Sequence, residues 1–133
     1  MDRLISEFQR DHVVIMDTLN VVKRHGLSSR EGKDGLNSVR DTLLAHLKKE
    51  DAHLYPVLRK AAEKDEALKQ TLDLFAKDMA EISNAALKFF AKYAAGGAGT
   101  EFARDFGGLY ATLQGRIRKE ENNLYKAYEK LNP

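Results

Sequence analysis

The sequence contains no cysteine, and this absence excludes disulfide bonds, thiolate metal sites and cysteine nucleophiles. Any metal bound by this chain must therefore use histidine, aspartate, glutamate or tyrosine side chains. Proline is scarce as well, because only Pro56 and Pro133 occur. The glycines concentrate in residues 26–35 and 96–99, which are therefore the expected loops.

Long apolar runs and an excess of charge of one sign are also lacking. No apolar run approaches the roughly 18 residues that a membrane-spanning helix needs, and residues 1–12 mix charges with apolar side chains instead of forming a signal-peptide core. The net charge is +2, with Lys and Arg interspersed among Asp and Glu rather than gathered into a stripe. We therefore expect a cytoplasmic protein that binds neither membranes nor nucleic acid.

Apolar residues recur at steps of three and four through most of the chain, which is the period of an amphipathic helix. Gly26 is placed to end the first helix, Thr100 to cap the fourth, and Pro56 to kink the second or to mark a change of segment. The pattern predicts four helices, at about residues 3–25, 34–62, 66–94 and 101–131. We expect an all-α fold, an antiparallel up-down-up-down four-helix bundle, forming one domain over residues 1–133.

The second and fourth predicted helices carry an internal repeat. HLKKEDAHLYPVLRK at residues 46–60 returns 70 residues later as RIRKEENNLYKAYEK. Glu50 recurs as Glu120, whereas His46 becomes Arg116 and His53 becomes Asn123. A fainter echo links residues 11–19 with 77–87 and sets His12 opposite Asp78. Each half of the chain is thus predicted to form one helical hairpin.

Several ionisable side chains fall on the apolar faces of these helices. His12, for example, lies four residues after Phe8 and three before Ile15, so it is expected to point inward. The other inward candidates are His46, Glu50 and His53 in the second helix, Asp78 in the third, and Arg116 and Glu120 in the fourth. Because an unpaired buried charge is costly, so many inward groups need a common explanation. A metal coordinated by side chains from facing helices supplies one.

His46 and Glu50 lie one helical turn apart, and His12 from a neighbouring helix would complete a set of two histidines and one carboxylate. This set with open positions is the ligand preference of non-haem Fe(II). His53 is an alternative ligand, because Glu50 and His53 have the Glu-x-x-His spacing of di-iron bundles. A lone inward histidine is, however, more often a hydrogen-bonded core residue than a ligand.

Three further residues have ordinary structural interpretations. His25, just before Gly26, is expected to interact with the C-terminal end of the first helix dipole. Tyr55 and Tyr125 recur in the repeat, and we expect them to anchor helix packing with their hydroxyl groups near solvent.

The order of these motifs resembles that of the hemerythrin-like, or HHE cation-binding, domains. The resemblance is carried by RDH at residues 10–12 and by HLKKEDAHLYP at 46–56, which has the pattern HxxxEE followed by LYP. It implies a four-helix bundle around a carboxylate-bridged di-iron centre that binds O2 or related small molecules. It also implies that one iron is served by His12, His46, Glu50 and Glu120.

Two positions depart from the family pattern. Asp78 stands where a third-helix histidine is expected, and Arg116 stands where the second HxxxE begins. Arginine is permanently charged and has a fork of donors suited to carboxylates. We hypothesise that Arg116 is a surrogate for the second metal and pairs with Asp78, and also with Glu120. The remaining site would then hold one iron, with Glu120 or His53 completing the ligands; a site for two irons and a metal-free polar network are the alternatives.

These outcomes correspond to three functions. The first is a protein that binds, stores or senses O2, NO or iron without turning over a substrate. It is favoured because the chain shows no nucleophile with an adjacent base and no phosphate-binding loop. The second is a non-haem iron enzyme that consumes peroxide or NO. The third is a metal-free bundle that acts as an interaction module, through its surface or as a homodimer.

Overall fold

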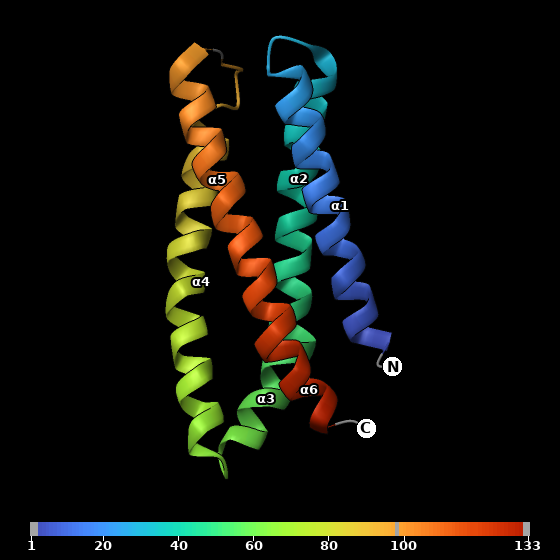
Figure 1. The fold of residues 1–133 in the computed structure, drawn as a ribbon, viewed down its shortest axis with the longest axis vertical. Coiled ribbons are helices and arrows are strands. Elements are labelled where there is room, and N and C mark those ends of the chain that lie inside the picture. Colours follow the sequence, from blue (N-terminus) through green and yellow to red (C-terminus); the bar gives the residue numbers. More distant parts are fainter. Residues whose placement is uncertain (1–2, 98, 132–133) are drawn as a thin grey trace.

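The computed structural model describes residues 3–97 and 99–131 as an assembly of long helices (Figure 1). Two five-residue π-helical segments, η1 and η2, join α2 to α3 and α5 to α6. The elements are α1 (Arg3–His25), α2 (Arg30–Lys49), η1 (Glu50–Leu54), α3 (Tyr55–Ala62), α4 (Glu66–Lys92), α5 (Gly99–Lys119), η2 (Glu120–Leu124) and α6 (Tyr125–Leu131). The expectation of an all-helical bundle is confirmed for the described residues.

Figure 1 shows where the connections between these helices lie. The link from α1 to α2 and the link from α4 to α5 are at the upper end of the view, and the link from α3 to α4 is at the lower end. Each π-helical segment lies in the lower half of its helix, so the two copies of the sequence repeat stand at a similar height.

The second helix begins earlier than expected. It starts at Arg30, because the Ser29 side chain accepts a hydrogen bond from the Gly32 backbone N–H at 3.2 Å and so caps the helix. Gly32 thus lies inside α2 rather than in a loop. A Cβ atom there would stand only 1.5 Å from the carbonyl oxygen of Gly26. Glycine is required at this position because the helix passes directly against the turn that ends α1.

The starts of α4 and α5 illustrate two different helix beginnings. Asp65 caps α4, since its side chain accepts from the Leu68 N–H at 3.1 Å. The expectation that Thr100 caps the fourth helix is wrong, because α5 already begins at Gly99. Gly99 has a φ of +82°, a conformation that glycine adopts at little cost.

Both π-helical segments begin at the repeated glutamate. The Tyr55 N–H donates to the carbonyl of Glu50, five residues earlier, and the Tyr125 N–H donates to that of Glu120 in the same way. The change of segment expected near Pro56 is present, since this residue follows Tyr55 at the start of α3. The second copy, however, forms the same segment with Lys126 in the place of the proline. Proline is therefore not the common cause.

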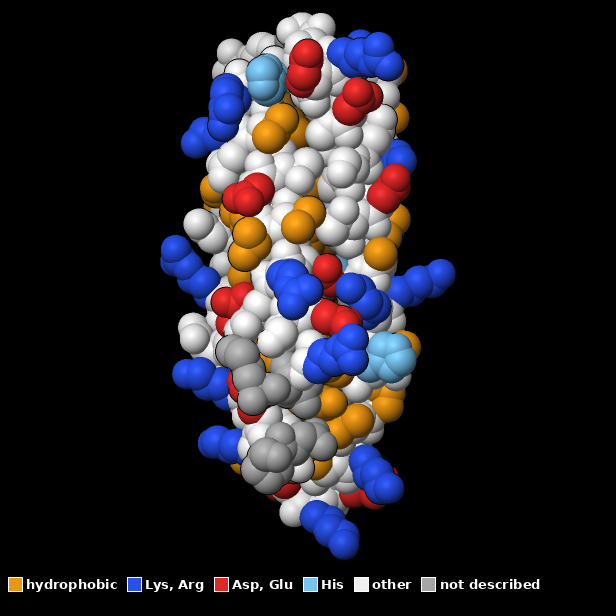
Figure 2. Space-filling view, turned by 90° about the vertical axis from the view of Figure 1, so that its right-hand side faces the viewer, with side chains coloured by type: hydrophobic (Ala, Val, Ile, Leu, Met, Phe, Trp, Pro, Cys, Tyr) orange, Lys and Arg blue, Asp and Glu red, His pale blue; other side chains and the backbone are white. Residues whose placement is uncertain are grey.

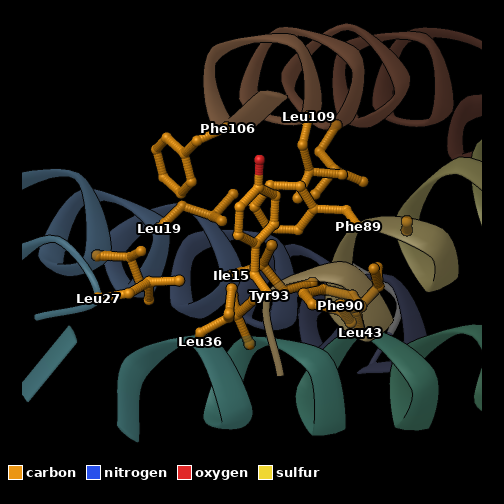
Figure 3. Packing of buried hydrophobic residues seen from close by; sticks show 14 of the residues in the cluster. Ile15, Leu19, Leu27, Leu36, Leu43, Phe89, Phe90, Tyr93, Phe106 and Leu109 are labelled. Carbon is orange, nitrogen blue, oxygen red and sulfur yellow. The ribbon is translucent and has the colours of Figure 1, made fainter. Parts of the chain in front are cut away.

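The apolar interior of the described residues divides into two clusters. The larger fills the upper part of the bundle, where side chains from α1, α2, α4 and α5 interdigitate (Figure 3). Its members include Leu19, Leu36, Phe89 and Phe106. The smaller cluster includes Phe8, Leu58, Leu72 and Leu124. Along α1, along α2 with η1, and along α5 with η2, the buried polar side chains lie between the two clusters. The burial of these apolar clusters supplies the main stabilisation of the fold.

The surface carries charges of both signs. Figure 2 shows Lys and Arg side chains interspersed with Asp and Glu over the face on the side of α1, with hydrophobic side chains scattered between them. Among the described residues, none of the helices combines the length and the apolar character that crossing a membrane requires.

Candidate metal centre

Four buried side chains from different helical segments meet between the two apolar clusters. They are His12 on α1, His46 on α2, Glu50 at the start of η1 and Glu120 at the start of η2. One ligand atom from each lies within 4.8 Å of the others. Each residue is at most 2% exposed. The inward orientation expected for these four residues is confirmed.

Both imidazole rings are held by carboxylates on their outer side. His12 Nδ1 lies 2.9 Å from Glu121 Oε2, and His46 Nδ1 lies 3.0 Å from Asp11 Oδ2. Lys49 Nζ holds the same Asp11 oxygen at 2.7 Å. When each Nδ1–H donates to its carboxylate, each Nε2 presents its lone pair to the interior, which is the arrangement of histidines that bind metals.

The inner nitrogen and carboxylate oxygen atoms of the cluster face one another and would be stabilised by a positive charge between them. The two histidine Nε2 atoms are 3.1 Å apart, so two lone pairs face each other unless a proton or a cation lies between them. Within the described part of the chain, Glu50 Oε1 and Glu120 Oε2 are buried without a hydrogen-bond partner. Buried carboxylate oxygens without partners are costly. A cation bound by these four residues would satisfy them, so the residues present fit a metal ion.

The pKa shifts of the cluster show that, without a metal, protons on its side chains supply the positive charge. Burial alone would raise the pKa of Glu50, but hydrogen bonds from His46, Glu120 and Tyr125, together with the charge of His46, lower it to about 2. Burial and the neighbouring Glu50 carboxylate raise the pKa of Glu120 well above its usual value. Burial opposes the charged form of His46, yet hydrogen bonds to Glu50 and Asp11 raise its pKa. Without a metal, Glu120 is therefore held as the neutral acid beside an ionised Glu50.

Tyr125 places its hydroxyl group among the four candidate ligands. The hydroxyl donates to Glu50 Oε2 at 2.7 Å and lies 3.1 Å from His12 Nε2 and 3.5 Å from His46 Nε2. The residue is only 1% exposed. The expectation that its hydroxyl lies near solvent is therefore wrong.

The π-helical segment η2 explains this position of Tyr125. On a regular α-helix, five residues would turn Tyr125 about 140° away from Glu120. The wider π-helical turn, closed by the hydrogen bond between these two residues, brings them to nearly the same face. The recurrence of the tyrosine in both copies of the repeat was the only sequence signal for this role.

The comparison with known protein families agrees with this geometry. The family model described as hemerythrin HHE cation binding domain matches residues 3–128. The chain belongs to the hemerythrin HHE cation-binding family. A search of curated proteins and a search of solved structures each found no significant match. The family supports a cation-binding protein, and the cluster of histidines and glutamates is where this hemerythrin-like domain could hold the cation.

His53 lies outside the cluster of four candidate ligands, contrary to the expected inward orientation. It is exposed, whereas Leu54 beside it is fully buried. The π-helical segment η1 adds a residue to the turn after Glu50, which shifts the buried face by one position. The same shift leaves Val57 39% exposed and Leu58 buried. His25 is exposed in the last turn of α1, where a cation complements the helix dipole.

Arg116 is buried in the second half of the bundle, at 4% exposure. Its Nη2 donates to the Tyr55 hydroxyl at 3.0 Å, and its Nη1 donates to the Phe75 carbonyl at 3.3 Å. The guanidinium carbon lies 4.5 Å from the centre of the Phe75 ring. Its Nε lies 3.9 Å from Glu120 Oε2. Tyr55 is thus also an inward residue, with a hydroxyl that accepts from a buried cation rather than facing solvent.

The expected pair between Arg116 and Asp78 does not form among the described residues. Asp78 is half-buried and lines an open groove beside Arg116, together with Glu81 and Lys119. The guanidinium donors point instead to Tyr55 and to the backbone of α4, as described above. Asp78 is therefore not placed with the four candidate ligands.

Sequence reasoning missed the two carboxylates that hold the imidazoles. Asp11 directly precedes His12 but binds His46, and Glu121 directly follows Glu120 but binds His12. Each holds the histidine of another helix, and periodicity within one helix cannot show such a pairing. The adjacency of an acidic residue to an inward residue was the available signal.

Proposed function

We propose that this hemerythrin-like domain binds iron through His12, His46, Glu50 and Glu120, and uses it to bind or sense O2 or NO. The observation that carries the proposal is the meeting of two inward Nε2 atoms with two carboxylates that have unpartnered oxygens. Two histidines with carboxylate ligands and open positions suit non-haem Fe(II). The antiparallel up-down-up-down order of the bundle is part of this proposal, and the connections in Figure 1 support it.

The bound iron would supply an open coordination position, and the chain's own residues prepare its surroundings. Asp11 and Glu121 fix the orientation of the two imidazoles. The Tyr125 hydroxyl provides a hydrogen-bond donor beside the ligand atoms. Because the four candidate ligands are at most 2% exposed, the site suits a diatomic ligand better than a large substrate. We therefore propose binding rather than turnover; a cytoplasmic location and a homodimer stay predictions.

Iron retention tests this proposal. Protein stripped with a chelator is incubated anaerobically with Fe(II) and desalted, and its iron content is measured before and after exposure to NO. The wild type should retain iron and change its absorption spectrum with NO. His46→Ala should lose most of the iron, because it removes a buried ligand atom. His53→Ala is the matched control and should retain it, because His53 is exposed.

Two results would contradict the proposal. One is a wild-type protein that retains no iron after anaerobic loading. The other is a folded His46→Ala variant that retains as much iron as the wild type, which would place the iron elsewhere.

A second candidate function is a metal-free bundle that acts through its surface. It is favoured by the burial of Arg116 beside the pair of Glu50 and Glu120, because a guanidinium can offset the negative charge shared by this pair without a metal. This function predicts that metal ions leave the unfolding temperature unchanged. Iron binding predicts that the temperature rises with the metal concentration, since a ligand that binds the folded state stabilises it.

A further inference from the structure

The two halves of the bundle repeat each other in their buried positions. Helix α1 matches α4 at a shift of 67 residues, which pairs residues that are buried in both helices. These pairs are Ile5 with Leu72, Phe8 with Phe75, Leu19 with Ala86, and Val22 with Phe89. At this shift His12 matches Met79, and Asp11 matches Asp78. The expectation that Asp78 stands in the place of a third-helix ligand is therefore corrected to Met79.

The contacts of Arg116 repeat those of His46. The His46 ring lies 5.3 Å from the ring of Phe8, and the Arg116 guanidinium lies 4.5 Å from the ring of Phe75. His46 lies beside the hydroxyl of Tyr125, and Arg116 donates to the hydroxyl of Tyr55. Each residue thus stands between a phenylalanine of the other helix of its own hairpin and the tyrosine that follows the π-helical segment of the other hairpin. Arg116 occupies the position in the second half that His46 occupies in the first.

The charge of Arg116 is directed at the shared carboxylates. Its Nε and Glu120 Oε2 are 3.9 Å apart, and both atoms are buried without another partner within the described chain. Arginine keeps its charge at every relevant pH, so it supplies a fixed cation to this side of Glu120. Met79, in the place that matches His12, has only a thioether, which is a weak acceptor.

We propose that Arg116 takes the place of a second cation and so limits the centre to a single metal ion, with Arg116 acting as a positioning residue for Glu120. This inference rests on the proposed function, because it concerns the number of ions in that same site. A second metal ion and the Arg116 guanidinium would compete for the same side of the Glu120 carboxylate. The guanidinium is covalently attached to the chain and does not leave. The site for the first ion, on the side of His12 and His46, is unaffected.

The groups that would support a second site are still present in the chain. Asp11 orients His46, and the matching Asp78 lines the groove beside Arg116. Lys49 holds Asp11, and the matching Lys119 lines the same groove. An imidazole at position 116 would thus have an acidic neighbour available for its outer nitrogen. The loss of the second site is therefore reversible by two substitutions.

Metal stoichiometry tests the inference. The wild type, Arg116→Lys and the double variant Met79→His/Arg116→His are loaded anaerobically with Fe(II), and in parallel with Zn(II), and the bound metal per chain is measured after desalting. Circular dichroism verifies that each variant is folded. We expect one ion in the wild type, one in Arg116→Lys, which keeps a cation, and two in the double variant.

Each outcome decides between the claims. Two ions in the wild type would overturn the role of Arg116 while leaving iron binding intact. No ion in the wild type would overturn the proposed function and this inference with it. A folded double variant that binds only one ion would also overturn the inference. If the double variant does not fold, two ions bound by the wild type would still overturn the inference, and one ion would support it.

Discussion

Replacing Tyr125 with phenylalanine should destabilise the metal-free protein by about 2–3 kcal/mol of unfolding free energy, because it removes a buried hydrogen bond to a charged group. The hydroxyl donates to Glu50 Oε2 at 2.7 Å, and Glu50 Oε1 has no partner among the described residues. After the substitution His46, 3.3 Å from Oε2, and the neutral Glu120 acid remain as partners of the Glu50 carboxylate. The ring contacts with Phe8 and His12, both at 5.5 Å between centroids, remain possible. The loss is therefore electrostatic rather than a packing defect.

Urea-induced unfolding followed by far-UV circular dichroism, in the presence of a chelator, measures this effect. Tyr110→Phe is the matched control, because its hydroxyl donates to Asn20 Oδ1 at 3.1 Å in an exposed setting. It should cost about 0.5 kcal/mol or less. If Tyr125→Phe is no more destabilising than Tyr110→Phe, the Tyr125 hydroxyl does not stabilise the ionised Glu50 carboxylate, which would contradict the hydrogen bond between them.

Two further predictions concern packing and pH. Gly32→Ala should destabilise the protein by about 2 kcal/mol or more in the same urea assay, because the new Cβ meets the Gly26 carbonyl. Gly107→Ala, which places its Cβ in open space within α5, is the control and should stabilise the protein by up to about 1 kcal/mol. Equal effects of the two substitutions would refute the close approach at the α1–α2 turn. The metal-free protein should lose stability as the pH rises, since Glu120 and His46 have raised pKa values in the folded state. Their contributions are complete below the usual values of 4.5 and 6.5 and are lost above them. Urea midpoints between about pH 5 and pH 8 measure this trend, and a midpoint that rises with pH would contradict it.

Zinc binding should show the opposite dependence on pH. A metal competes with the protons held by His46 and Glu120, so its apparent affinity should increase as the pH rises through the same range. Competition with a chromophoric chelator measures the affinity, and an affinity independent of pH would show that the metal binds elsewhere.

The sequence predicted the part of the fold and of the site that regular α-helical periodicity controls. His12 and His46 lie upstream of the π-helical segments and Glu50 is the first residue of η1, so the step of 3.6 residues placed each on the buried face. Glu120, at the first residue of η2, was placed for the same reason. The family resemblance, read from the same residues, was confirmed over residues 3–128.

The errors have one main physical cause. A π-helical turn depends on hydrogen bonds that the hydrophobic pattern does not show, so the α-helical period extended past Glu50 turned His53 inward. Tyr55 was expected to anchor packing, but with its hydroxyl near solvent rather than facing Arg116. The same extension past Glu120 did not show that the Tyr125 hydroxyl points to the buried cluster. Asp78 was misplaced for a different reason, because the faint echo between the first and third helices was aligned one residue from the register that burial shows. The carboxylates that hold the histidines come from other helices, and only the assembled bundle shows them.

Diffraction data collected at the iron absorption edge from crystals of the anaerobically loaded protein would test the central claim most directly. We expect one anomalous peak, within bonding distance of the Nε2 atoms of His12 and His46 and of oxygens of Glu50 and Glu120, with the Arg116 guanidinium still buried beside Glu120. No peak at this cluster in crystals that contain iron, or a peak held by other residues, would contradict it.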